Sequence, residues 1–172
     1  MNYANIKKTD IANGPGVRVS LFVSGCRRHC PECFNPETWS FSFGREYTQA
    51  TEDEIIRLLT PDYITGLSLL GGEPMEPENQ PALLQLVQRV RRELPEKTIW
   101  CYSGSQLERD ILPMAAQNET TRLLLQNIDV LVDGEFVVAQ KNLRIRFRGS
   151  ENQRLIDVPK TLAAGSVVEW EG

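Results

Sequence analysis

The chain has 172 residues, 41% of them hydrophobic and 24% charged, and a formal net charge of −4. This length suits one well-formed core, and the negative charge, with no basic face evident, argues against a nucleic-acid partner. The chain starts without an apolar signal region, and no apolar segment approaches the ~20 residues that span a membrane. We therefore expect a single-domain cytoplasmic protein with no membrane partner.

A turn and a buried strand come first. Residues 10–16 contain two glycines and a proline, which favour a turn. In residues 17–23 apolar and polar side chains alternate and then give way to the continuous run Leu21-Phe22-Val23, which is typical of a strand buried on both faces. Ligand sites of α/β folds lie at the carboxyl ends of such strands, so the next loop is a candidate site.

Three cysteines follow this strand: Cys26, Cys30 and Cys33 form a C-x3-C-x2-C pattern within a loop, residues 24–36, that we call the cluster loop. Thiolates bind iron–sulfur clusters or zinc, and this close spacing lets one loop wrap a metal centre at little cost in chain entropy. Three ligands would leave the fourth iron of a four-iron cluster open. An open iron points to chemistry rather than to a purely structural site.

A zinc site is the alternative, because His29 lies in the same loop and Cys3His is a common zinc ligand set. However, His29 directly precedes Cys30, and two adjacent residues rarely both reach one tetrahedral ion from a tight loop. The fourth cysteine, Cys101, lies far along the chain in an apolar stretch where a small buried residue fits. On this alternative the protein would be a zinc-stabilised interaction module.

The chain then alternates between helices and strands. Residues 51–54 resemble a capping box, so we expect a helix from Thr51 that ends at Pro61. A strand at 66–70 runs into Gly71-Gly72-Glu73-Pro74, where two glycines allow a ligand to approach the backbone closely. Further elements are predicted as a helix at 81–94, a strand at 97–103, a helix at 107–126 with a break near Pro113, and a strand at 128–134.

This βαβαβαβ order predicts a mostly parallel sheet with right-handed crossovers. Residues from about 140 to 172 are expected to be irregular, with one or two short strands. The chain is too short for the eight βα units of a closed barrel, which need ~250 residues. We therefore expect an α/β fold in the form of a partial, open (β/α) barrel, whose open side would admit a loop of another protein.

The cysteine loop after a strand, followed one βα unit later by Gly-Gly-Glu-Pro, resembles the radical S-adenosylmethionine (SAM) superfamily. The resemblance implies that Cys26, Cys30 and Cys33 hold a [4Fe–4S] cluster and that SAM chelates the open iron. In that superfamily the reduced cluster passes one electron to the sulfonium of SAM, giving methionine and a 5′-deoxyadenosyl radical.

The same resemblance implies contacts with SAM. These would come from Glu32, Cys33 and Phe34 along the cofactor and from Gly71, Gly72 and Glu73 near its methionine end. The position before the third cysteine is often aromatic in the superfamily and stacks on adenine, but here it is Glu32. Phe34 is expected to supply that surface instead. No side chain beyond the cluster ligands is assigned a catalytic role.

Other segments resemble one family within this superfamily, the activating proteins of anaerobic ribonucleoside-triphosphate reductase, over most of the chain. The segments that carry this resemblance are 13–16, 21–26, 35–39, 71–74, 129–134 and 148–154. It implies that the 5′-deoxyadenosyl radical removes hydrogen from a glycine Cα of the reductase's large subunit, with electrons from a donor such as a flavodoxin. An activator of another glycyl-radical enzyme, such as pyruvate formate-lyase, or a small-molecule radical SAM enzyme, is the alternative.

Overall fold

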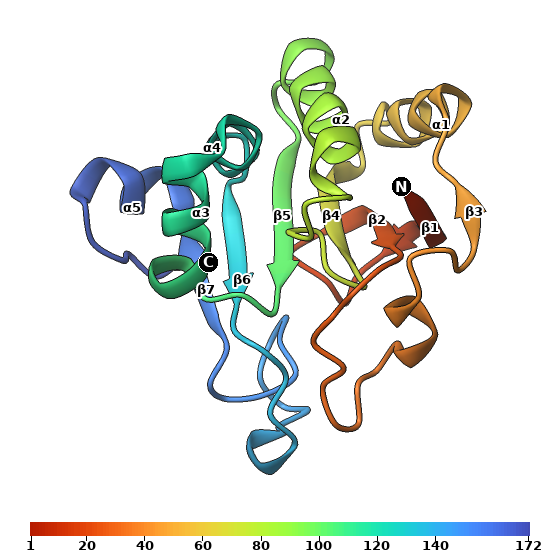
Figure 1. The fold of residues 1–172 in the computed structure, drawn as a ribbon. Helices are drawn as coiled ribbons and strands as arrows, with labels where there is room; N and C mark the ends of the chain where they lie inside the picture. The colour runs from red at the N-terminus through yellow and green to blue at the C-terminus, as the bar shows by residue number, and fades with distance from the viewer.

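The computed structural model describes the whole chain, residues 1–172, and contains one seven-stranded mixed sheet in the order β3-β1-β2-β4-β5-β6-β7 (Figure 1). The four central strands β2, β4, β5 and β6 are parallel, and the outer strands β1, β3 and β7 are antiparallel to their neighbours. The strands are β1 (Asn2–Asp10), β2 (Val17–Val23), β3 (Arg45–Glu46), β4 (Ile64–Gly71), β5 (Thr98–Ser103), β6 (Val130–Asp133) and β7 (Arg154–Asp157). The predicted α/β fold with a mostly parallel core is confirmed.

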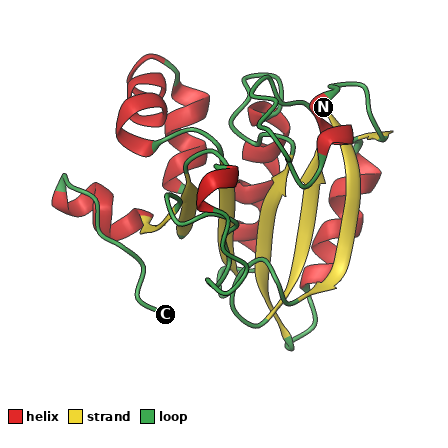
Figure 2. Ribbon diagram, turned by 90° about the horizontal axis from the view of Figure 1, so that it is seen from below, coloured by secondary structure: helices red, strands yellow, loops and turns green.

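Helices fill the connections between the parallel strands, and in Figure 2 they lie behind the central strands while loops cross in front. They are α1 (Gln49–Leu59), α2 (Gln80–Glu93), the π-helical turn η2 (Leu107–Ile111), α3 (Leu112–Gln117), α4 (Glu119–Gln126) and α5 (Val158–Ala164), with two short 3-10 helices, η1 (Pro36–Trp39) and η3 (Val138–Gln140). None of these helices has the length and apolarity needed to cross a membrane.

The main core lies between the sheet and the helices. Alternate residues of each parallel strand point into it, because successive side chains of a strand face opposite sides. Those with no exposed surface are Val19, Leu21, Val23, Leu67, Leu69, Ile99, Cys101 and Leu131, and they belong to one cluster with Ile55, Leu83, Leu86 and Leu124 of the helices.

The opposite face of the sheet is covered by loops and by the end of the chain. Trp100 of β5 packs edge-to-face against Phe147 and Trp170, with ring centroids 5.4 and 4.9 Å apart. Val130 and Val132 of β6 belong to the same small cluster. Both faces of the parallel strands are therefore buried, as the continuous apolar run of β2 predicts.

Arg18 of β2 is fully buried beneath this second face. Its guanidinium donates hydrogen bonds to Ser68 Oγ (2.8 Å) and to the carbonyl oxygens of Leu67 (2.9 Å) and Thr98 (3.0 Å), and it lies 5.6 Å from the centre of the Trp100 ring. Burial lowers the pKa of Arg18 to about 10. The hydrogen bonds of the Arg18 side chain thus link β2 to β4 and β5 on the loop-covered face of the sheet.

Two predicted boundaries are wrong. α1 begins at Gln49, two residues before the predicted start, because the N-cap is Thr48: its hydroxyl accepts a hydrogen bond from the Thr51 N–H, while the Thr51 hydroxyl accepts one from the Thr48 N–H. The helical region after β5 does not break near Pro113, which lies in the first turn of α3, where a proline needs no N–H partner. It breaks at Asn118, whose side chain caps α4.

Both ends of the chain are more regular than predicted. β1 has no counterpart among the predicted elements, because Tyr3 and Ile6 are its only large apolar residues and it lies near the sheet edge. The segment from about 140 to 172 contains β7, one of the short strands predicted there, and also the helix α5, which was not predicted. Asp157 caps α5 by accepting a hydrogen bond from Lys160 N–H, and Gly165 ends it with a left-handed φ of 72°.

Candidate metal and cofactor site

The cluster loop begins where β2 ends and is tied to the segment that follows it. Gly25 N–H donates to the Thr38 carbonyl (2.7 Å), and Cys26 N–H donates to the Trp39 carbonyl (3.1 Å). Gly25 has a φ of 104°, and a Cβ there would meet the Phe41 ring at 2.3 Å, so only glycine fits. These contacts fix where the first cysteine emerges from the sheet.

All three cysteines are half-buried and line one pocket of about 460 Å³ at the carboxyl ends of the parallel strands. Of the other residues predicted to contact SAM, those that line this pocket are Phe34, Gly71, Gly72 and Glu73. Glu32 does not: it is exposed, with an unusual φ of 56°. The structure thus brings together every predicted site residue except Glu32.

The residues present fit an iron–sulfur cluster. Burial raises the pKa of the Cys26 thiol and of the Cys30 thiol. The positive charge of bound iron would favour their thiolate forms, which are the forms that ligate a cluster. No three His, Cys, Asp or Glu side chains lie close enough together to hold a single metal ion. In a four-iron cluster each thiolate binds a different iron, so the three sulfurs need not converge on one point.

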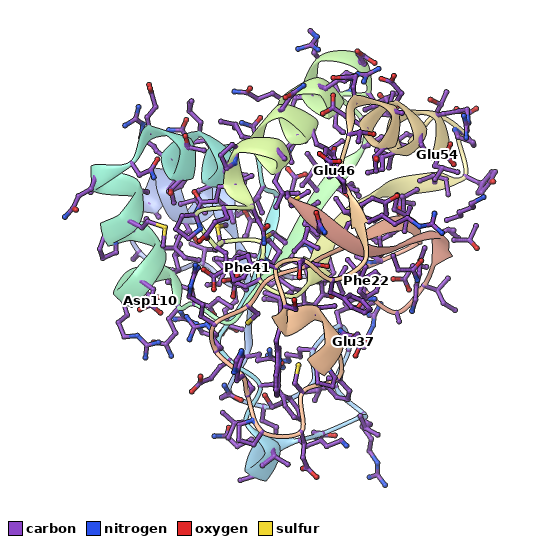
Figure 3. All side chains as sticks on the ribbon, turned by 45° about the vertical axis from the view of Figure 1, so that its right-hand side comes forward. Phe22, Glu37, Phe41, Glu46, Glu54 and Asp110 are labelled. Carbon is purple, nitrogen blue, oxygen red and sulfur yellow. The ribbon has the colours of Figure 1, made fainter.

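Two arginines between Cys26 and Cys30 anchor the loop to the scaffold. Arg27 donates from its backbone N–H to Glu76 Oε1 (2.9 Å), its side chain pairs with Glu76 and Glu78, and its guanidinium lies 4.5 Å from the Phe41 ring centre. In Figure 3 Glu37 of η1 and Asp110 of η2 lie on either side of this loop.

The Arg28 side chain, unlike that of Arg27, extends toward the carboxyl ends of β4 and β5. It donates to Ser105 Oγ (2.8 Å), and its side-chain nitrogens lie 3.8 Å from carboxylate oxygens of Glu73 and Glu135. A Cβ at Gly104 would meet the Arg28 side chain at 2.4 Å. The sequence gives no sign of this role, because Arg28 and its partners are far apart in the chain.

The Gly-Gly-Glu turn after β4 is packed directly against the cluster loop. Gly72 N–H donates to the Val23 carbonyl (2.7 Å) and Glu73 N–H to the Gly25 carbonyl (2.8 Å). A Cβ on Gly72 would lie 2.7 Å from the Gly25 carbonyl oxygen and 2.8 Å from that of Thr38. Glycine at position 72 is therefore what lets the two loops approach.

Glu73 is buried, and its carboxylate accepts hydrogen bonds from the N–H groups of Met75 (2.9 Å) and Gly104 (2.7 Å). Burial raises the pKa of this carboxyl. Each oxygen already has a backbone partner, so the side chain ties the end of β4 to the end of β5. Glu73 also lines the pocket.

The side chains of His29 and Cys101 do not belong to this pocket. His29 is exposed and stacks on Trp39, with ring centroids 4.4 Å apart. Cys101 is fully buried in the helix-facing core. Neither lines the pocket.

Phe136 is a pocket residue that the sequence reasoning missed. Its ring centroid lies 4.9 Å from that of Phe34, and both residues line the pocket. The signal was present: Phe136 follows a predicted strand closely, and the loops after parallel strands meet at the same edge of the sheet. The two rings form an aromatic wall beside Cys33.

Comparisons with known proteins bear on the cluster and on the family of this chain. A family model described as a 4Fe-4S single cluster domain matches residues 12–156. Proteins named anaerobic ribonucleoside-triphosphate reductase-activating protein are similar over nearly the whole chain. The one from Vibrio cholerae is 48% identical and the one from Escherichia coli K12 is 46% identical, each over 89% of this chain and 96% of the relative. One from Enterobacteria phage T4 is 40% identical over 90% of this chain and 93% of the relative.

Proposed function

The chain belongs to the family of anaerobic ribonucleoside-triphosphate reductase-activating proteins, and from this premise we propose that it makes the glycyl radical of the reductase's large subunit by cleaving SAM at a [4Fe–4S] cluster. When bound and reduced, the cluster would supply one electron that breaks the C5′–S bond of SAM, releasing methionine and a 5′-deoxyadenosyl radical that takes hydrogen from a glycine Cα. The observation that carries the proposal is a pocket lined by three cysteines and no fourth.

Cys26, Cys30 and Cys33 would each hold one iron and leave the fourth iron for SAM. The chain's contribution is to position this loop. Gly72 lets it approach the end of β4, Gly25 leaves room for the Phe41 ring, and Arg27 and Arg28 hold the middle of the loop. Cys101 has no part in the proposal, because it lies in the core.

SAM would lie along the cluster loop, contacting Cys33 and Phe34, with its methionine end at the backbone of Gly71, Gly72 and Glu73. Phe34 and Phe136 offer an aromatic wall for adenine, since offset aromatic contacts are favourable. Glu32 would have to turn inward from its exposed position to take part, so we assign the adenine contact to Phe34 rather than to Glu32.

The fold suits this chemistry if residues 1–172 form one radical SAM domain, with the central strands as a partial, open barrel. A barrel that is open on one side would admit a protein loop carrying the target glycine. The donor of the electron would be a small one-electron carrier such as a flavodoxin. The protein supplies orientation and shielding, while the cofactors carry the chemistry.

A deuterium-transfer experiment tests the proposal. The large reductase subunit is prepared with α-deuterated glycine and mixed anaerobically with the cluster-loaded protein, reductant and SAM. Mass spectrometry should find deuterium in the 5′-deoxyadenosine, in proportion to the glycyl radical formed. Formation of 5′-deoxyadenosine without deuterium would leave SAM cleavage standing and remove the reductase glycine as its target.

A further inference from the structure

A loop rich in cations closes one side of the pocket. Residues 141–148, which we call the basic loop, extend beyond the carboxyl end of the sheet between β6 and β7, beside the cluster loop (Figure 1). The two ends of the loop are joined by backbone contacts: Lys141 and Ser150 form an isolated antiparallel β-bridge, and Asn142 N–H donates to the Gly149 carbonyl (3.1 Å). It is thus held at a fixed place on the pocket rim.

The basic loop presents two different sides. Leu143, Ile145 and Phe147 line the pocket, whereas the alternating residues Arg144 and Arg146 are exposed to solvent. Phe147 has a φ of 65°, which is unusual for an aromatic residue. Such strained positions persist where surrounding contacts hold them, and they concentrate at functional sites.

The cations of this loop have no acidic partners. Lys141, Arg144, Arg146 and Arg148 form no ion pair, whereas most other arginines of the chain do. Glu151, which follows the loop, accepts a hydrogen bond from Asn142 instead. A chain with a net charge of −4 therefore keeps a concentrated, unneutralised positive patch at the mouth of its pocket.

Exposed apolar side chains lie beside these charges. Leu143 is 76% exposed and Phe34 is 56% exposed, although both line the pocket. Arginine combined with exposed apolar surface is characteristic of protein–protein interfaces. A nucleic acid is a poorer fit, because the acidic remainder of the chain would repel a polyanion that extended beyond this small patch.

We propose that the basic loop is the docking surface for an acidic segment of the protein substrate, placed so that the neighbouring part of that substrate can enter the pocket. This inference rests on the proposed function for the identity of the substrate. Arg144 and Arg146 would attract the acidic segment, and Leu143 would contact apolar side chains near the target glycine. Charges at an interface rim act mainly on the rate and salt dependence of association.

The test compares two double variants that both remove two positive charges and add two negative ones. Arg144→Glu with Arg146→Glu changes the basic loop. Lys8→Glu with Arg45→Glu changes two exposed cations that also lack ion pairs but lie away from the pocket, along β1 and β3. For each cluster-loaded protein we would measure the Kd for the large reductase subunit at low and high salt, and SAM cleavage without that subunit.

The basic-loop variant should bind the subunit about tenfold more weakly at low salt, with little remaining salt dependence, while cleaving SAM at the normal rate. The control should bind like the wild type. Equal Kd values for both variants, or no binding by the wild type, would overturn the docking proposal. So would a loss of SAM cleavage in the basic-loop variant, or wild-type binding to anionic vesicles or nucleic acid in place of the subunit.

Failure of the docking proposal can be told apart from failure of the proposed function. If the wild type forms the glycyl radical and the basic-loop variant binds and activates normally, only the docking site is wrong. If the wild type binds through the basic loop but no glycyl radical forms, the docking site stands and the proposed function falls.

Discussion

The helix-packed face of the central sheet and the loops at the carboxyl ends of its strands contain different kinds of residue. On the helix-packed face the side chains are apolar and fully buried, and even its cysteine, Cys101, packs as a small hydrophobic residue. In the loops the cysteines are half-buried. The three residues other than glycine with positive φ, His29, Glu32 and Phe147, all lie in these loops.

This difference separates stability from chemistry. Substitutions on the helix-packed face should lower the free energy of unfolding of the protein, because its side chains stabilise the fold through burial of apolar surface and dispersion contacts. The loops keep strained backbone, unpaired cations and exposed aromatic rings, which cost stability and are retained where function requires them. Changing one region at a time tests this separation.

Removal of a cysteine ligand should have the largest effect on SAM cleavage. Cys30→Ala leaves two thiols for the cluster, so we expect loss of the cluster and of SAM cleavage. Cys101→Ala should leave both nearly unchanged, because that thiol lies in the core. Iron and sulfide content, visible absorption and 5′-deoxyadenosine formation measure the effect. Equal loss in the two variants would disprove the three-ligand site.

Gly72→Ala should be the next most harmful change. The added Cβ would overlap the carbonyl oxygens of Gly25 and Thr38, so the cluster loop must move away from the end of β4. We expect SAM cleavage to fall about 100-fold, since a shift of about 1 Å near reacting groups costs that much.

The control for Gly72→Ala is Gly165→Ala, where a Cβ meets nothing within 4 Å. Because φ is positive there, the control should lower the free energy of unfolding by about 1 kcal/mol and leave SAM cleavage intact. If Gly72→Ala cleaves SAM as fast as this control, the close approach of the two loops is not needed.

Arg18→Met tests the scaffold. It leaves carbonyl and hydroxyl groups of β4 and β5 without their donor, so the free energy of unfolding should fall by about 3 kcal/mol, while SAM cleavage per folded molecule should stay normal. Urea unfolding of the cluster-free protein measures this. Arg45→Met, at an exposed position, should stay within about 0.5 kcal/mol of the wild type. A comparable loss in both would show that Arg18 is not a structural link.

His29→Ala should have the smallest effect. It removes the stacking on Trp39, which contributes about 1 kcal/mol at most at an exposed position, and no proton transfer is assigned to the imidazole. SAM cleavage should change less than about twofold. If the rate of SAM cleavage falls strongly in His29→Ala and is equally low in His29→Phe, which keeps an aromatic ring, then His29 has a chemical role.

The sequence predicts those parts of the site that are local in the chain. The cysteine spacing, the continuous strand before it and the two glycines after β4 are each readable within a few residues, and the βα alternation places them at one edge of the sheet. The parallel strands are predictable for the same reason.

Other features depend on residues that meet only in the fold. Arg28 reaches Ser105, which follows two parallel strands later, and Glu73 accepts a hydrogen bond from Gly104, which lies one βα unit further along the chain. Arg89 of α2 pairs with Asp53 of α1, and Arg91 pairs with Asp129 before β6. The charge pattern of a single helix cannot show which acids another element brings to it.

The measurement that tests the central claim most directly is an electron paramagnetic resonance spectrum. The cluster-loaded protein, a one-electron reductant, SAM and the large reductase subunit are mixed without oxygen. The account predicts a glycyl-radical doublet that depends on SAM and is accompanied by 5′-deoxyadenosine. A cluster-loaded protein that gives neither the doublet nor 5′-deoxyadenosine would contradict it.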